Sequence, residues 1–213
     1  MTKTSQNYST IKETTIFGFN SIFKIVGVKK VLFSNWINIL PFITSFLIVI
    51  LCFILKIDFY ITVIEIKNLM INFLPGILGF TVAGYSFMIG LIHVGMINKI
   101  TEPLSEENKF SLYQKSSATF AANIIIQAIS LVFAYLFHLF IFFDIKKQMK
   151  IDINDIYTTL INFVALLSIS YLFVISLLMI IQVIINIFNF SQLHHYFVNK
   201  EKIEQKRNQI QNR

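Results

Sequence analysis

The sequence predicts an all-α integral membrane protein: a four-helix transmembrane bundle with an interfacial amphipathic helix before it and a helical tail after it. Four stretches contain no Asp, Glu, Lys or Arg, namely 31–55, 68–98, 116–143 and 156–199. Each is longer than the roughly 20 apolar residues that cross the hydrocarbon core of a bilayer, about 30 Å thick. Backbone groups in lipid must bond within the protein, and the alternation of a membrane strand is absent, so helices are expected.

The apolar runs also set the expected bounds. The transmembrane domain is expected over 37–190, with spans near 37–55, 72–97, 119–143 and 157–190. Residues 1–36 are expected to form a cytoplasmic segment, and residues 191–213 a cytoplasmic tail. A chain of 213 residues leaves room for this one domain and for no separate soluble one. Pro41 and Pro75 fall in the expected first turns of spans one and two, where a missing N–H is harmless.

Basic residues are placed unevenly. Thirteen lie before span one, between spans two and three, and after span four, whereas five lie in the other two connections. A Lys/Arg excess marks the cytoplasmic face, so both termini are expected in the cytoplasm. This placement accounts for the net charge of +7 without direct nucleic-acid binding, which is not expected. The polar start lacks the pattern of a secretory signal, so span one is expected to stay in the mature protein.

The N-terminal segment contains the expected amphipathic helix. Apolar residues recur near helical spacing from Ile16 to Phe33, and three lysines gather toward its end: Lys24, Lys29 and Lys30. Such a helix suits the membrane interface, with its lysines on anionic lipid heads. A helical extension of span one is the alternative.

The tail and the outer connections leave alternatives open. Tyr196, Ile203 and Ile210 recur every seven residues, which allows a short coiled coil, a partner-binding helix or a solvated helix. The basic residues Lys200, Lys206 and Arg207 are expected to contact a cytosolic partner or lipid. Two-residue alternation at 59–63 and 149–153 leaves small outer strands possible.

Small residues mark one face of span two. Spacings of three and four place six residues on this face: Gly76, Gly79, Ala83, Ser86, Gly90 and His93. Small side chains let helix backbones approach closely, and this packing drives helix association in lipid. The face is predicted to be a packing seam, within one bundle or between the subunits of an oligomer, whereas Gly84 lies on another face.

Polar residues form a stripe on span three. Asn123, Gln127 and Ser130 follow helical spacing, and a second stripe on span four contains Gln182, Asn186 and Asn189. Buried amides in hydrocarbon need partners, so both stripes are expected to face protein and not lipid.

Catalytic and metal chemistry are not expected. The predicted spans contain no charged residue, whereas proton relays and ion pathways usually place one there. His93 and His138 are expected at opposite depths and cannot share a metal, and His194 and His195 lack nearby ligands. Motifs such as HExxH, GxSxG and the P-loop are missing, and Cys52 is interpreted as a small buried residue. No cofactor is expected.

The layout resembles the membrane components of bacterial anti-phage systems, and most nearly the membrane subunits of the Kiwa system. The resemblance rests on Gly79-Phe80-Thr81-Val82-Ala83-Gly84-Tyr85 in span two and on Ser111-Leu112-Tyr113 with Ala118-Thr119-Phe120-Ala121 after it. It implies a homo-oligomer, a tetramer, in the inner membrane, with a cytosolic DNA-binding partner and a role in sensing phage. Other four-span defence proteins, including effectors triggered by cyclic nucleotides, share the layout.

Three functions follow as hypotheses. The first is a non-enzymatic membrane sensor or scaffold that oligomerises and recruits a cytosolic partner. The second is a pore-forming effector that depolarises the cell, with Asn123, Gln127 and Ser130 as its candidate lining. The third is a small transporter subunit, against which the missing charges and the lack of broken helix pairs count.

Overall fold

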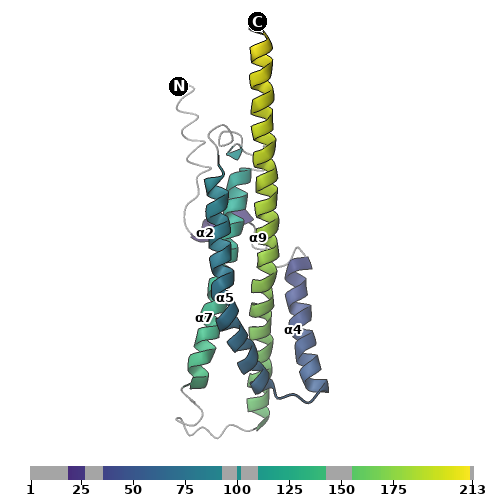
Figure 1. The fold of residues 1–213 in the computed structure, drawn as a ribbon. Helices are drawn as coiled ribbons and strands as arrows, with labels where there is room; N and C mark the ends of the chain where they lie inside the picture. The colour runs from purple at the N-terminus through teal and green to yellow at the C-terminus, as the bar shows by residue number, and fades with distance from the viewer. Residues whose placement is uncertain (1–18, 27–35, 93–99, 102–109, 143–154, 212–213) are drawn as a thin grey trace, which may run out of the picture. The chain divides into compact units, whose positions relative to one another are not determined.

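The computed structural model describes residues 19–26, 36–92, 100–101, 110–142 and 155–211 (Figure 1). Within these residues the chain is helical and forms no strand, so the all-α prediction is confirmed. The helices are α2 (Phe19–Val26), α4 (Trp36–Ile54), α5 (Phe59–Gly90), α7 (Leu112–Phe142) and α9 (Asp155–Gln211).

Three of these helices are long and apolar enough to cross a membrane. They are α5, most of α7, and α9 from Tyr157 onward. The apolar run of α4, Ile39–Ile54, is shorter than the usual span. The prediction of transmembrane helices is therefore supported by length and composition, and the fourth crossing by α4 stays a prediction.

The turn between α4 and α5 is short and well defined. Lys56 has a left-handed φ of 54°, its N–H donates to the Phe53 carbonyl at 3.3 Å, and the next N–H, of Ile57, donates to the Cys52 carbonyl at 2.9 Å. These two bonds form the Schellman motif that ends a helix. Lysine here takes the place that glycine usually holds.

Helix α5 begins earlier than the sequence analysis expected. The Asp58 carboxylate accepts a hydrogen bond from the Tyr60 N–H at 2.8 Å and so caps the helix. Residues 59–63 are therefore the first turns of α5, and the possibility of a strand there is wrong; residues 149–153 lie outside the described residues. Pro75 lies inside α5 and Pro41 inside α4, not in their first turns.

Helix α7 also begins earlier than expected, at Leu112. The Ser111 hydroxyl accepts a hydrogen bond from the Gln114 N–H at 3.2 Å, and the Gln114 side-chain oxygen accepts one from the Ser111 N–H at 3.0 Å. This reciprocal pair is a capping box, which satisfies two backbone donors at the helix start.

Helix α9 continues to Gln211 without a break. It has 57 residues and contains neither glycine nor proline. The span expected over 157–190 and the tail expected after it therefore belong to one helix. Of the expected interfacial helix, residues 19–26 form α2, and the other residues lie outside the described part.

The chain divides into two compact units, where the sequence analysis expected one domain. The first unit comprises residues 1–28, 83–122 and 183–213, and the second comprises residues 29–82 and 123–182. Helices α5, α7 and α9 are long, and each contributes residues to both units.

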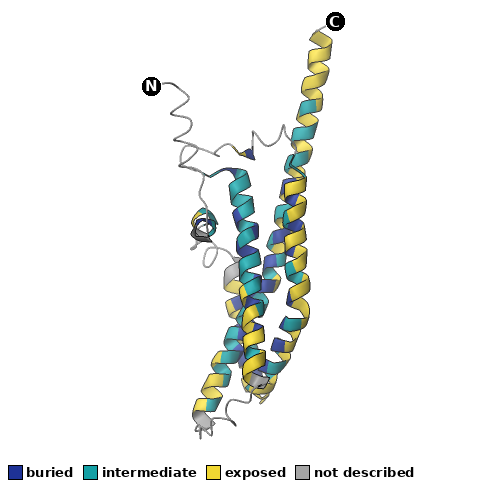
Figure 2. Ribbon diagram, turned by 90° about the vertical axis from the view of Figure 1, so that its left-hand side faces the viewer, coloured by how far each residue is buried: buried dark blue, intermediate teal, exposed yellow. Residues whose placement is uncertain are grey.

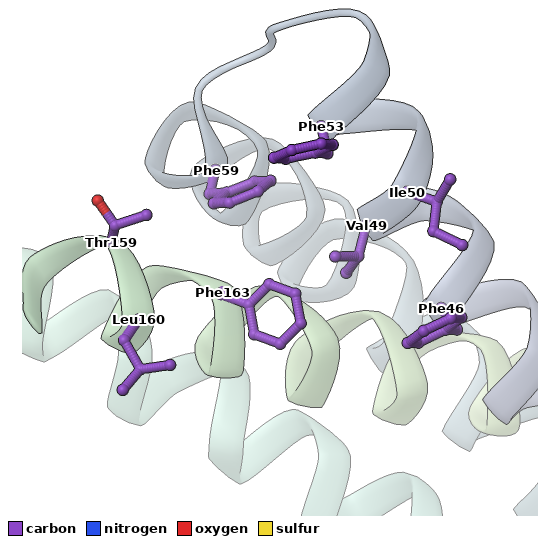
Figure 3. Close-up of a pocket in the computed structure, with 8 residues that line it drawn as sticks. All are labelled: Phe46, Val49, Ile50, Phe53, Phe59, Thr159, Leu160 and Phe163. Carbon is purple, nitrogen blue, oxygen red and sulfur yellow. The ribbon is translucent and has the colours of Figure 1, made fainter. Parts of the chain in front are cut away.

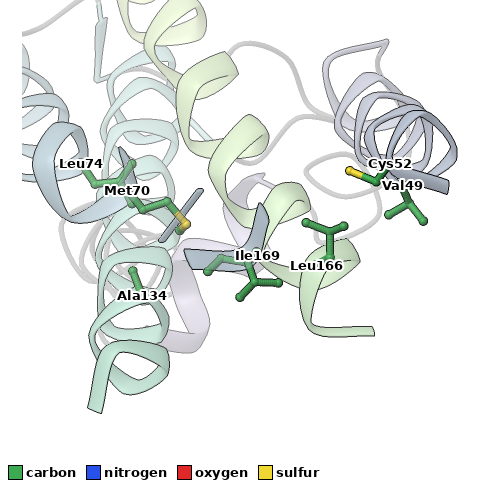
Figure 4. Close-up of a cluster of buried hydrophobic side chains, with 8 residues drawn as sticks. Val49, Cys52, Met70, Leu74, Ala134, Leu166 and Ile169 are labelled. Carbon is green, nitrogen blue, oxygen red and sulfur yellow. The ribbon is translucent and has the colours of Figure 1, made fainter. Parts of the chain in front are cut away.

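Each unit has its own apolar core. The core of the second unit contains Val49 and Cys52 of α4, Met70 and Leu74 of α5, Ala134 of α7, and Leu166 and Ile169 of α9 (Figure 4). The core of the first unit contains Met88, Ile100, Phe120, Val183 and Phe190. Many other apolar side chains are exposed (Figure 2), as expected for helix surfaces that contact lipid.

Candidate functional site

The polar stripe of α7 lies in the interior of the second unit. The exposed fractions of its side chains are 2% for Asn123 and 0% for Gln127 and Ser130. Gln127 is also the midpoint of the 31-residue helix, which places it deep in any bilayer that α7 crosses. The stripe therefore faces protein within this chain.

Amide groups of this stripe have atoms without partners, whereas the hydroxyl group of the stripe has one. Ser130 donates to the Ile126 carbonyl at 2.9 Å. In contrast, neither polar atom of the Gln127 amide has a hydrogen-bond partner among the described residues, and the same holds for the Asn123 Nδ2. Each such group costs roughly 1–3 kcal/mol.

The chemistry of an amide limits what could satisfy Gln127. Its side chain has one acceptor oxygen and two N–H donors. A cation could pair only with the oxygen, and an anion only with the N–H groups. A single partner for both must donate and accept, as a water molecule or another amide does.

The second stripe, on α9, is only partly buried. Gln182 and Asn186 are half-buried, and the Asn186 Nδ2 has no partner within the described chain. Asn189 is exposed, so the expectation that this stripe faces protein is wrong at that position. A run of amides at helical spacing sets a common face but not its burial.

A buried lysine lies inside α5, and the sequence analysis missed it. Lys67 is 4% exposed, and its Nζ lies 3.2 Å from the Nδ1 of His138 on α7. The expected span began at Asn72, so Lys67 was assigned to the outer connection together with Glu65. Helix α5 contains both residues, although the expected span excluded them, so its apolar part and its helical part have different bounds. A signal was available, since apolar residues flank Lys67 at helical spacing on both sides.

The lysine–histidine contact joins α5 to α7 within the second unit. Which of the two nitrogens donates depends on the tautomer of the histidine ring. A charged side chain inside a membrane-crossing helix is costly and usually marks a functional position.

The small-residue face of α5 is open in the described structure. An added Cβ at Gly76, Gly79 or Gly90 would meet no atom within 4 Å. Ala83 and Ser86 are exposed, and His93 lies outside the described residues. No helix of the described chain therefore packs closely against these three glycines.

Gly84 is the glycine of α5 at a close helix contact. A Cβ at this position would lie 2.7 Å from the Cδ1 of Ile187 and 3.5 Å from a methyl of Val183, both on α9. Tyr85 follows it, with its hydroxyl 3.1 Å from that of Ser117 and its ring 5.7 Å from the ring of Phe120. Tyr85 and Phe120, one from each segment that supports the resemblance, thus meet in the first unit.

An apolar pocket lies between α4 and α9, at the start of α5 (Figure 3). Its volume is about 670 Å³, and its lining comprises Phe46, Val49, Ile50, Phe53, Phe59, Thr159, Leu160 and Phe163. Thr159 is the one polar residue of this lining. The pocket therefore suits an apolar group such as an acyl chain and disfavours a charged ligand.

Four of the basic residues predicted to contact a partner or lipid lie on the surface. Lys24, Lys200, Lys206 and Arg207 are exposed, whereas Lys29 and Lys30 lie outside the described residues. Cys52 is buried, with its sulfur 3.6 Å from the Thr62 hydroxyl. In the part of the chain that the structure describes, His, Cys, Asp and Glu form no group of three that could hold a metal ion.

Together, the fold and the site define a helical membrane protein with a buried polar stripe and one buried lysine in its apolar helices. No protein-family model, curated protein or solved structure matches the chain.

Proposed function

We propose that this protein is a non-enzymatic, oligomeric scaffold or sensor that recruits a cytosolic protein to the bacterial inner membrane. The observation that carries the proposal is the length of α9 together with the composition of its end. A helix of 57 residues is roughly 85 Å long, whereas the hydrocarbon core needs about 30 Å. A large part of α9 must therefore lie outside the membrane.

The end of α9 suits a partner and not lipid. Residues 202–211 are all exposed, and both charged and amide side chains are frequent between Asn199 and Gln211. The excess of basic residues near both termini supports a cytoplasmic position for this end. The role in anti-phage defence, the tetramer and the DNA-binding activity of the partner rest on the resemblance alone.

The open face of α5 supports the oligomeric part of the proposal. Gly76, Gly79 and Gly90 meet no neighbour within the described chain, although small residues at this spacing favour close helix contact in lipid. A second copy of the chain would bring a helix to this face.

Removal of residues 200–213 should abolish recruitment and leave the protein in the membrane. The full-length protein and this truncated form would be tagged at the N-terminus and purified in mild detergent from the native host. We expect a cytosolic protein at near-equal amount with the full chain and none with the truncated form. Removal of residues 212–213 alone is the control. A partner that co-purifies with both truncated forms would contradict the proposal.

A pore-forming effector is the second candidate, and the buried amides of α7 favour it. Asn123 and Gln127 place unpartnered polar groups at mid-helix, where a water-filled path would need them. For a pore, we expect ions to leak from cells that contain the protein and its trigger. The substitution Gln127→Leu should suppress this leak. Measurement of membrane potential with a dye tests this. Intact potential in triggered cells would argue against the pore.

A further inference from the structure

Exposed apolar side chains line one face of the last turns of α9, and we call this face the seam. We define it by Tyr196, Ile203 and Ile210, whose exposed fractions are 58%, 67% and 75%. Their spacing of seven residues is close to two helical turns, so they share one face. Most other residues at this end of α9 are exposed as well (Figure 2). Exposure of large apolar side chains to water costs free energy, and a partner that covers them removes this cost.

The two isoleucines of the seam face away from the protein's own core, and the Tyr196 ring contacts the edge of this core through the ring of Phe197, with 5.4 Å between the ring centroids. Phe190 of α9 is 4% exposed within the core of the first unit, and Phe197 packs against that core. At 3.6 residues per turn, both lie roughly 120–140° around the helix from Ile203. The seam is therefore free to bind something other than its own unit.

Cations border the seam, and acids lie farther around the helix. Lys200, Lys206 and Arg207 lie within about 60° of the line through the seam, and all three are exposed. Glu204 and Glu201 lie about 100° and 160° away. The partner-facing surface is thus an apolar stripe between positive charges.

Three other occupants fit the seam poorly. A second copy in parallel would place Lys200 and Arg207 of each helix beside like charges, which disfavours a homomeric coiled coil. A membrane surface would require the seam to lie in the bilayer plane. Helix α9 is continuous from Asp155 to Gln211 without glycine or proline, so it would have to break to do so. A phosphate backbone would gain nothing from the isoleucines.

We infer that the seam binds an amphipathic helix of a partner protein, with apolar residues at heptad spacing between flanking Asp or Glu residues. The inference rests on the proposed recruitment function and specifies its surface and the chemistry of the partner. From Tyr196 to Ile210 the seam is about 21 Å long, so the partner helix needs about four turns.

Two synthetic helical peptides of three heptads test the inference against the full-length protein in detergent. Both have isoleucine and leucine at the core positions; one has glutamate and the other lysine at the flanking positions. We expect the acidic peptide to bind at least tenfold more tightly, with an affinity that falls as salt rises. The combined change Lys200→Glu, Lys206→Glu and Arg207→Glu should reverse the preference.

Matched variants show whether the seam itself is responsible. Ile203→Asp with Ile210→Asp should weaken binding of the acidic peptide at least tenfold. Gln205→Asp with Asn208→Asp adds the same charge on the opposite face and should change it less than threefold. Equal binding of the two peptides, equal loss in the two variants, or an oligomer mass that depends on Ile203 would overturn the inference. If removal of residues 200–213 abolishes recruitment while Ile203→Asp with Ile210→Asp retains it, recruitment holds and the seam is wrong.

Discussion

Leucine at Gly79, Ala83 and Gly90 together should dissociate the proposed oligomer and leave the folded chain intact. An added Cβ would meet no described atom within 4 Å at either glycine, so the described chain leaves space where these side chains begin. Between subunits the same side chains would hold two helix backbones apart and remove the close packing that associates them in lipid. The mass of the detergent-solubilised protein, measured by light scattering, should fall to that of one chain.

Gly84→Leu is the matched control on the same helix. This side chain would be forced against Ile187 and Val183, and overpacking of this kind costs about 1–3 kcal/mol. Gly84→Ala should cost much less, because the nearest atom is the end of the Ile187 side chain, which can shift. The control should therefore lower the melting temperature and leave the mass of the detergent-solubilised protein nearly unchanged. An unchanged mass after the triple substitution would show that the face is not the oligomer contact.

Gln127→Leu should stabilise the protein by about 1–3 kcal/mol. Leucine keeps most of the volume, and it removes a donor and an acceptor that are fully buried without partners. It also forms helix as readily as glutamine does. Thermal unfolding of the purified protein in detergent, followed by circular dichroism at 222 nm, measures the effect.

Ser130→Ala is the control for this second prediction. Its hydroxyl already bonds to the Ile126 carbonyl, so its removal should change the stability far less than the glutamine substitution. Destabilisation by Gln127→Leu would mean that water or another amide pairs with Gln127 in the folded protein. That result would contradict the prediction and strengthen the case for a hydrated path along α7.

The helices follow from the sequence, but their starts required more than a search for uncharged runs. That criterion placed the start of span two after Lys67, whereas backbone hydrogen bonding continues to the Asp58 cap. Both caps were readable: Asp58 precedes an apolar run, and Ser111 stands three residues before Gln114. The placement of charged residues sets which part of a helix is favourable in lipid, whereas capping sets where the helix begins. The start of a membrane span and the start of its helix can therefore differ.

Spacing along the chain predicted which residues share a face, but it did not predict what each face contacts. The small-residue face of α5 and the polar stripe of α7 have the same kind of helical spacing. The first is open, and the second is fully buried. Helical geometry is local, whereas burial depends on which neighbouring helix lies beside a face.

The amino-acid sequence is sufficient to establish that this is a helical membrane protein, because long uncharged apolar runs have no other stable form in lipid. Three features needed the packed helices: the Lys67–His138 pair, the close approach at Gly84, and the unpartnered amide of Gln127. The first two features bring together residues that are far apart along the chain. The third depends on which groups surround Gln127 in space. Such relations are fixed only when side chains of α5, α7 and α9 meet, and no local pattern encodes them.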